Sequence, residues 1–176
     1  MNNSIFYHEV LENNAQLVEW FKHLHMYPEL PFEEHQTTKY IIEQLKEIPN
    51  IEIFPLENTG LVATLKGAHS GKVIALRADI DALPILEETE IDYKSKNDGV
   101  MHACGHDAHT SILLMTAKIL ASKQDQIHGE IRFVFQPAEE KIPGGALQVI
   151  ESGYLEGIDF MFGLHLMSFV PTDGNV

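Results

Sequence analysis

The sequence has a single cysteine, few basic residues and no long apolar segment, and each scarcity excludes a class of protein. One cysteine among 176 residues excludes an internal disulfide framework and favours a reducing cytoplasm. Twelve lysines and arginines against 26 acids give a net charge of −14, which disfavours nucleic acid and anionic membranes as partners. No apolar run approaches the roughly 18 residues of a membrane span, and the N-terminus lacks the features of a signal peptide. We therefore expect a cytoplasmic protein.

What remains is an ordinary globular composition. Hydrophobic residues make up 44% of the chain and charged residues 22%. No linker composition divides the sequence, so we treat residues 1–176 as part of one domain. Apolar residues at helical spacing predict helices over residues 10–26 and 33–47, separated by Pro28 and Pro31.

Short β-type runs fill most of the remaining chain. Strands are predicted at IEIFPLE from Ile51, GLVATLKG from Gly60, KVIALRADI from Lys72, EIRFVFQPA from Glu130 and IDFMFGLHL from Ile158. Helical patterns follow Ser111 and occupy residues 144–153, between the last three of these strands. This order predicts an α/β fold with a largely parallel central sheet flanked by helices.

The stretch MHACGHDAHTS, residues 101–111, contains the only cysteine, three histidines and an aspartate. Asp107 suits the first turn of the following helix, and Gly105 permits a sharp bend before it. Cys104 and His106 then lie just ahead of a helix N-terminus, where we expect the thiol pKa to be lowered. Thiolate and neutral imidazole together suit zinc or a similar transition metal. The motif alone proves no site, because a cysteine and a histidine this close more often have packing or surface roles.

Polar residues also follow the predicted strands. Asp79 and Asp81 end the strand from Lys72. Glu139 and Glu140 follow the strand from Glu130, and His165 ends the last strand. In open α/β sheets, ligands bind outside the carboxyl ends of the strands. Four separate segments, counting the Cys/His stretch, thus deliver acids, a thiol and imidazoles to one edge. This convergence favours a metal site.

The adjacent glutamates indicate a division of roles. Neighbouring residues point in different directions in an extended or turn backbone, so Glu140 can bind metal while Glu139 faces a bound water. A metal lowers the pKa of water, and a free carboxylate can take its proton and later protonate a leaving amine. Cys104, His106, Glu140 and His165 are donors of the kinds that zinc accepts. The predicted chemistry is metal-assisted hydrolysis.

Several blocks of the sequence resemble those of one family. PELPFEEH, LRADIDALPILEE, MHACGHDAHTS, FQPAEE followed by GGA, and GLHLM occur in family order. They are similar to the signature blocks of the amidohydrolase branch of the zinc aminoacylase/carboxypeptidase superfamily. That branch includes hippurate hydrolases, auxin-conjugate hydrolases and N-acetyldiaminopimelate deacetylases. The resemblance extends from about Trp20 to Pro171 and implies a zinc-exopeptidase-like catalytic domain that cleaves the amide bond of N-acyl amino acids.

The resemblance implies a role for each site residue. Two divalent metal ions are expected, zinc in the first place with manganese or cobalt as alternatives, and Cys104 would bridge them. His106 and His165 would complete one metal site, Glu140 would bind the other metal, and Glu139 would be the general base. The residues expected to orient the ligands without binding metal are Asp79, Asp81 and His109.

Members of this family are considerably longer than this chain. A smaller lid domain follows their GLHLM-like block, and the chain then returns to the catalytic domain with a final histidine ligand. The resemblance therefore implies that residues 1–176 form the N-terminal part of the catalytic domain, without the lid and the C-terminal segment. A homo-oligomer is expected by resemblance, although contacts made by the lid would be missing here.

Two other interpretations stay open. The chain could be a catalytically inactive metal-binding or interaction module, with Cys104, His106 and His165 holding one zinc. A cysteine hydrolase with Cys104 as nucleophile is weaker, because His106 is too close in sequence to be an assured base and the glutamates would go unused.

Other polar residues are expected to have ordinary roles. His25 is interpreted as a surface or partly buried residue, and Glu87 as part of a solvated acidic run. Arg77 lies within a predicted buried strand and needs a partner there; a structural ion pair with a nearby acid and a contact to substrate are equally favoured.

Overall fold

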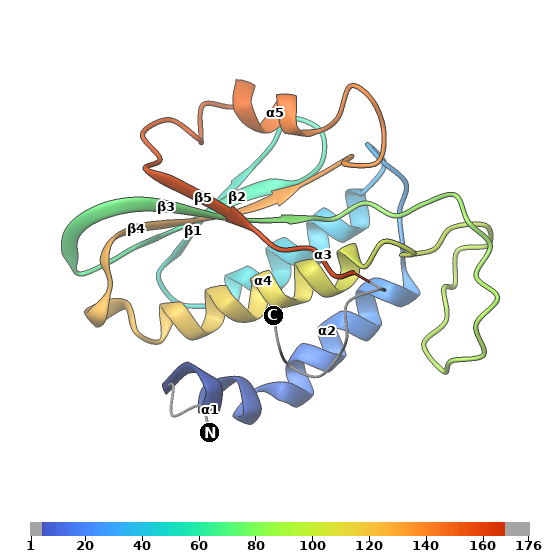
Figure 1. Cartoon of the computed structure of the whole chain (residues 1–176), viewed down its shortest axis with the longest axis horizontal. Coiled ribbons are helices and arrows are strands. Elements are labelled where there is room, and N and C mark those ends of the chain that lie inside the picture. Colours follow the sequence, from blue (N-terminus) through green and yellow to red (C-terminus); the bar gives the residue numbers. More distant parts are fainter. Residues whose placement is uncertain (1–4, 168–176) are drawn as a thin grey trace.

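The computed structural model describes residues 5–167, which form a five-stranded sheet with helices on both faces (Figure 1). The helices are α1 (Ile5–Glu12), α2 (Asn14–Met26), α3 (His35–Lys46), α4 (His106–Ala121) and α5 (Ala146–Glu151), with a short 3-10 helix at Gln124–Gln126. The strands are β1 (Ile51–Pro55), β2 (Leu61–Lys66), β3 (His69–Asp79), β4 (His128–Gln136) and β5 (Phe160–Gly163). The end of the family resemblance, residues 168–171, lies outside the described part.

The helix predicted over residues 10–26 is two helices that meet at Asn13. The side chain of Asn13 donates a hydrogen bond to the backbone oxygen of Glu9 (2.8 Å), and its own carbonyl accepts the N–H groups of Gln16 and Leu17. Asparagine competes with the helix backbone for hydrogen bonds, so α1 ends and α2 begins there. None of the helices within residues 5–167 has the length and apolarity needed to cross a bilayer.

The strand order in the sheet is β1-β2-β4-β3-β5. Strand β3 pairs in parallel with β4 and β5, whereas β2 pairs antiparallel with β1 and β4. The predicted α/β fold with flanking helices is confirmed, and its sheet is mixed. The length of each connection explains the direction of the strands it joins. A short turn joins β1 to β2, which requires these neighbours to be antiparallel. The connection from β3 to β4 includes α4 and is long enough for parallel neighbours.

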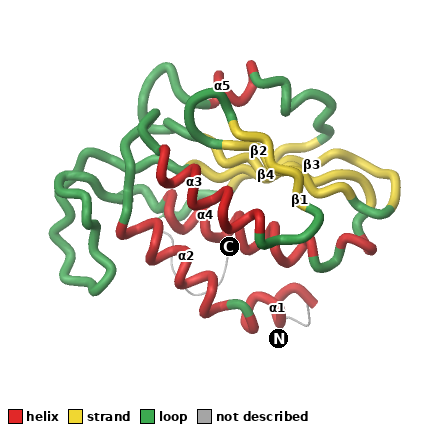
Figure 2. Tube along the Cα trace, turned by 180° about the vertical axis from the view of Figure 1, so that it is seen from behind, coloured by secondary structure: helices red, strands yellow, loops and turns green. Residues whose placement is uncertain are grey.

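Alternating strand residues separate two hydrophobic cores. On the face covered by α1 to α4, Phe133 and Phe135 of β4 pack in one cluster with Leu114 of α4, and all three are fully buried. On the opposite face, Val149 of α5 packs in a second cluster that includes Val62 of β2. Successive side chains of a strand point to opposite faces, so the inner strands β2, β4 and β3 each contribute to both cores. Helix α5 lies on one face of the sheet and the other helices on the opposite face (Figures 1 and 2).

The parallel strands β3, β4 and β5 end at the same side of the sheet. Asp79 ends β3, Gln136 ends β4 and Gly163 ends β5. Residues 80–105 then form a long connection without a helix or named strand, which projects beyond the sheet before α4 begins (Figure 2). The carboxyl ends of the parallel strands and the N-terminus of α4 therefore surround one region.

Candidate metal centre

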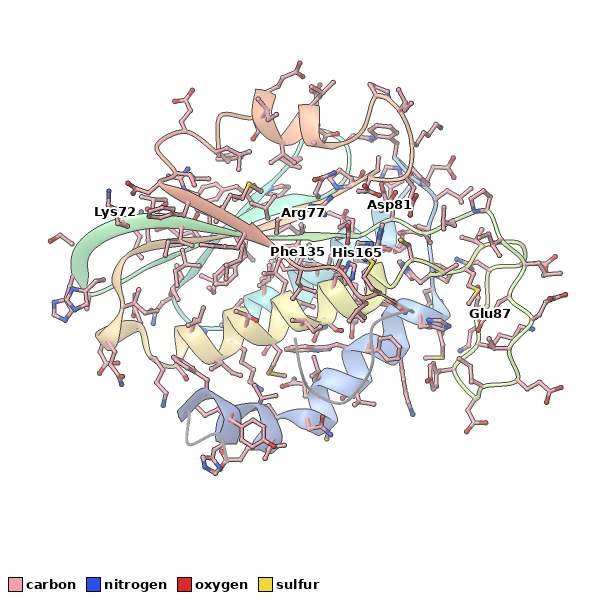
Figure 3. The ribbon with its side chains drawn as sticks, viewed as in Figure 1. Lys72, Arg77, Asp81, Glu87, Phe135 and His165 are labelled. Atoms are coloured by element: carbon pink, nitrogen blue, oxygen red, sulfur yellow. The ribbon has the colours of Figure 1, made fainter. Side chains whose placement is uncertain are left out.

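The predicted site residues lie in this region. Asp81 and His165 are close together beyond the carboxyl end of β3, whereas Lys72 lies toward the opposite end of that strand (Figure 3). Candidate ligand atoms form three groups, within each of which they lie no more than 4.8 Å apart. The groups are Cys104–His106–His165, Asp79–His106–His109 and His106–Glu139–Glu140. The structure thus brings all of the predicted ligands around His106.

His106 is the first residue of α4 and is 1% exposed. Its Nδ1 lies 3.0 Å from the backbone oxygen of Asp81 and 3.2 Å from Asp81 Oδ1. Both oxygens accept hydrogen bonds, so Nδ1 carries the proton and neutral His106 has its lone pair on Nε2. This buried Nε2 has no hydrogen-bond partner, and it lies 3.5 Å from Asp79 Oδ2 and 3.9 Å from Glu140 Oε1. An unpaired nitrogen that faces carboxylates fits a metal ligand whose orientation another carboxylate fixes.

Cys104 and His165 lie next to each other in the site. Gly105 has φ +84°, a left-handed conformation that glycine adopts easily, and it turns the chain between Cys104 and α4. The Sγ atom of Cys104 lies 3.4 Å from Nε2 of His165. Nδ1 of His165 donates to the carbonyl of Leu166 (2.7 Å), so Nε2 carries the lone pair that faces the sulfur. His165 was predicted at the end of a strand, and it lies two residues beyond β5, which ends at Gly163.

The glutamate pair follows β4 and reaches the site from a third direction. Glu139 is exposed and the side chain of Glu140 is 24% exposed, but the backbone between them is held. The N–H of Glu140 donates to Oδ2 of Asp81 at 2.9 Å. Asp81 is 1% exposed, and it therefore connects the glutamate loop to His106.

His109 has both ring nitrogens engaged. Its Nδ1 donates to Oδ1 of Asp79 (2.6 Å), and its Nε2 accepts the N–H of Leu166 (3.0 Å). These bonds tie α4 to the end of β3 and to the segment that carries His165. Asp79 also accepts a hydrogen bond from Nη1 of Arg77 (2.8 Å), which supplies the partner that the arginine requires. Burial opposes ionisation of Asp79, but His109, His106 and Arg77 lower its pKa to about 2.

The expectation that the helix N-terminus lowers the thiol pKa is wrong for Cys104. Burial, followed by hydrogen bonding to Glu140 and the charges of Glu140, Asp79 and Glu139, raises the pKa of this thiol to about 12. The nearby carboxylates outweigh the helix dipole, whose contribution is small. A thiol with this pKa is a poor nucleophile at neutral pH, which argues against a cysteine hydrolase. The same carboxylates favour positive charge at this position, so the surroundings of Cys104 suit a bound cation.

The interpretations of His25 and Glu87 as ordinary polar residues are also wrong. His25 is 6% exposed and Glu87 is 2% exposed. Nδ1 of His25 lies 2.6 Å from Oδ2 of Asp107, and its Nε2 lies 3.2 Å from Oε1 of Glu87. Asp107 directly follows His106, so this bridge supports the first turn of α4. In the sequence, the only indication of this bridge was the position of Asp107 within the MHACGHDAHTS block.

Comparisons with known proteins show what the chain is similar to. The model of the peptidase family M20/M25/M40 matches residues 75–176. The N-acyl-L-amino acid amidohydrolase of Geobacillus stearothermophilus is 47% identical over 157 residues, which are 89% of this chain and 42% of that protein. The hippurate hydrolase of Campylobacter jejuni is 44% identical over 163 residues, which are 92% of this chain and 42% of that protein.

A solved structure shows the same fold. A dinuclear metal-binding peptidase of the M20 family from Bacillus subtilis superimposes with a TM-score of 0.85 at 46% identity. The match covers 89% of this chain and 44% of that one. The chain therefore spans less than half the length of the relatives it matches.

Proposed function

Because the chain belongs to the peptidase family M20/M25/M40, as its sequence blocks indicated, we propose that the whole protein hydrolyses the amide bond of N-acyl amino acids. The names of the similar amidohydrolase and hippurate hydrolase support this substrate class. In this proposal, residues 1–176 are the N-terminal part of the catalytic domain. A reducing cytoplasm suits the protein, since Cys104 must stay reduced to bind metal as a thiolate.

The observation that carries the proposal is the buried, unpaired Nε2 of His106 at the centre of three ligand groups. We assign Cys104, His106, Glu140 and His165 as the residues that would hold the metal. Their sulfur, imidazole and carboxylate donors suit zinc, with manganese or cobalt as alternatives. Two ions are proposed because the similar Bacillus subtilis peptidase is described as dinuclear. Bound divalent ions would supply Lewis acidity, which lowers the pKa of water and polarises the amide carbonyl.

Glu139 is the general base in this proposal. Glu139 is exposed, and a carboxylate oxygen of its side chain lies within 4.8 Å of candidate ligand atoms of His106 and Glu140. The carboxylate removes a proton from water as the water oxygen bonds to the carbonyl carbon. The same group returns that proton to the amide nitrogen when the C–N bond breaks, which releases a carboxylate and a free amino acid.

Three further residues keep the proposed ligands in orientation. Asp81 accepts the Nδ1 proton of His106 and so directs Nε2 into the site. Asp79 binds His109, and His109 binds the backbone of Leu166, next to His165.

The substitution Glu139→Gln tests the assignment in the whole protein, because it keeps the shape of the side chain and removes the base. We expect kcat for an N-acetyl or N-benzoyl amino acid to fall about 10²–10⁴-fold, with metal content unchanged. Glu151→Gln, at the exposed end of α5, is the matched control and should keep wild-type kcat. Near-normal turnover by Glu139→Gln would refute the role of the base. Bound metal without turnover in the unmodified protein would support the inactive metal-binding module instead.

A further inference from the structure

Glu34 is a fully buried carboxylate immediately before α3. Its Oε1 accepts the backbone N–H of Ala138 (2.7 Å), and its Oε2 accepts the hydroxyl of Thr59 (2.7 Å). Within residues 5–167 it forms no ion pair with a basic side chain, and burial raises its pKa. Burying such a group is costly, so its two hydrogen bonds identify what it contributes: it fixes the Ala138 peptide.

Ala138 connects β4 to the glutamate pair and has an uncommon backbone conformation. It is fully buried, and its φ of +47° lies in the left-handed region that residues other than glycine rarely adopt. Its N–H bonds to Glu34, and its carbonyl accepts the N–H of Gly145 at 2.9 Å. Such a conformation persists only where the surroundings hold it. Because Glu139 follows directly, the Ala138 backbone sets the direction in which the glutamates leave the sheet.

The loop that carries Ala138 and the glutamate pair is also held by close packing around Pro137. A Cβ atom on Gly60 would lie 2.5 Å from Cδ of Pro137, and one on Gly145 would lie 2.0 Å from the Pro137 oxygen. The loop therefore passes between the β1–β2 turn and the start of α5 without room for a side chain on either. The N–H of Gly60 donates to Oγ1 of Thr38 (2.8 Å), which ties the turn to the helix that Glu34 precedes.

Two buried carboxylates thus hold the backbone on both sides of Glu139. Asp81 binds the N–H of Glu140 and also contacts His106, so it is part of the metal centre. The hydrogen bonds of Glu34 go to the loop and to the β1–β2 turn, and they reach the centre only through Ala138. We propose that Glu34 is a positioning residue that directs Glu139 and Glu140 into the site. This inference rests on the proposed function of those glutamates.

Substitutions of Glu34 in the whole protein test the proposal. Glu34→Ala removes the acceptor for Ala138, and we expect kcat to fall about 10–100-fold with KM changed less than about threefold, because misplaced catalytic groups lose rate. Glu34→Gln should restore kcat to within about fivefold of the wild type, because its amide oxygen can accept the same N–H. Glu34→Asp keeps the charge, but its shorter side chain moves the carboxylate oxygens away from Ala138, and we expect kcat to fall about tenfold. This variant replaces Glu34→Ala in the test if Glu34→Ala does not fold.

Glu29→Ala is the matched control. The carboxylate of Glu29 accepts the backbone N–H groups of Gln36 (3.1 Å) and Thr37 (2.7 Å) at the start of α3, so it also supports this helix, but not the glutamate loop. We expect this variant to be less stable while its folded fraction keeps wild-type kcat.

Hydrogen–deuterium exchange of residues 138–141 supplies a measurement that does not need activity. The amides of this segment should exchange faster in Glu34→Ala and Glu34→Asp than in the wild type, Glu34→Gln or Glu29→Ala. If the unmodified protein cleaves no N-acyl amino acid, the proposed function fails, while the exchange rates still decide whether Glu34 holds the loop. Unchanged exchange in Glu34→Ala and Glu34→Asp would overturn the proposal. So would equal losses of kcat and protection in Glu34→Ala and Glu29→Ala, since these would indicate a general loss of stability.

Discussion

The bridge of His25 to two buried carboxylates predicts a stability that depends on pH. His25 of α2 contacts Asp107 of α4 at 2.6 Å and Glu87 of the connection 80–105 at 3.2 Å. The hydrogen bond with Asp107 is the largest influence on the His25 pKa and raises it; burial opposes this, and Glu87 raises it further. Glu87 also accepts the N–H of Ser95 (2.6 Å). Protonated His25 therefore joins three segments of the chain through charge-assisted hydrogen bonds.

The direction of the pH effect follows from the raised pKa. A histidine in the unfolded chain titrates near pH ~6.5, and folded His25 binds its proton more tightly. The stabilisation is therefore complete below about pH 6.5 and is lost as the pH rises through the folded-state pKa. Each unit of difference in pKa corresponds to about 1.4 kcal/mol. His25→Leu leaves two buried carboxylates without their shared partner, and we expect it to lower the free energy of unfolding by about 3–5 kcal/mol.

Urea unfolding of the whole protein at several pH values between 5.5 and 9 measures both effects, with metal concentration kept constant. The loss of stability in His25→Leu should be largest at the acidic end and should shrink as the pH rises. His8→Leu, at an exposed position of α1, is the matched control and should unfold like the wild type. A loss that is independent of pH, or that grows toward alkaline pH, would refute this account of the bridge.

Two further predictions concern the metal centre and the core. Asp81→Asn should weaken metal binding about 10–100-fold, because it disturbs the contact that orients His106; competition with a chelating dye measures the affinity, and an unchanged value would contradict the role of Asp81. Phe133→Ala, at a fully buried position between the sheet and α4, should lower the free energy of unfolding by about 3–5 kcal/mol. A loss below about 1 kcal/mol in denaturant titrations would show that the cavity left by the phenylalanine collapses.

Local patterns in the sequence were sufficient for most secondary structure and for the outline of the site. The apolar run from Glu130 predicted β4, and the structure extends this strand over His128–Gln136. Strand periodicity and turn residues act between near neighbours, so they can be read without a fold. Residues at the ends of parallel strands meet at one edge, which is why Asp79, Glu140 and His165 could be placed together in advance.

Contacts between remote segments were decided by the tertiary structure alone. His25 and Asp107 are 82 residues apart, and Glu34 and Ala138 are 104 residues apart. No periodicity relates such pairs, because their contact depends on how whole helices and loops pack against the sheet. The raised pKa of Cys104 has the same origin, since carboxylates from other segments determine it. The sequence by itself determined which elements form and which polar groups face one edge; the assembled fold decided which buried groups share protons and hold the backbone, because burial and charge are properties of the packed chain.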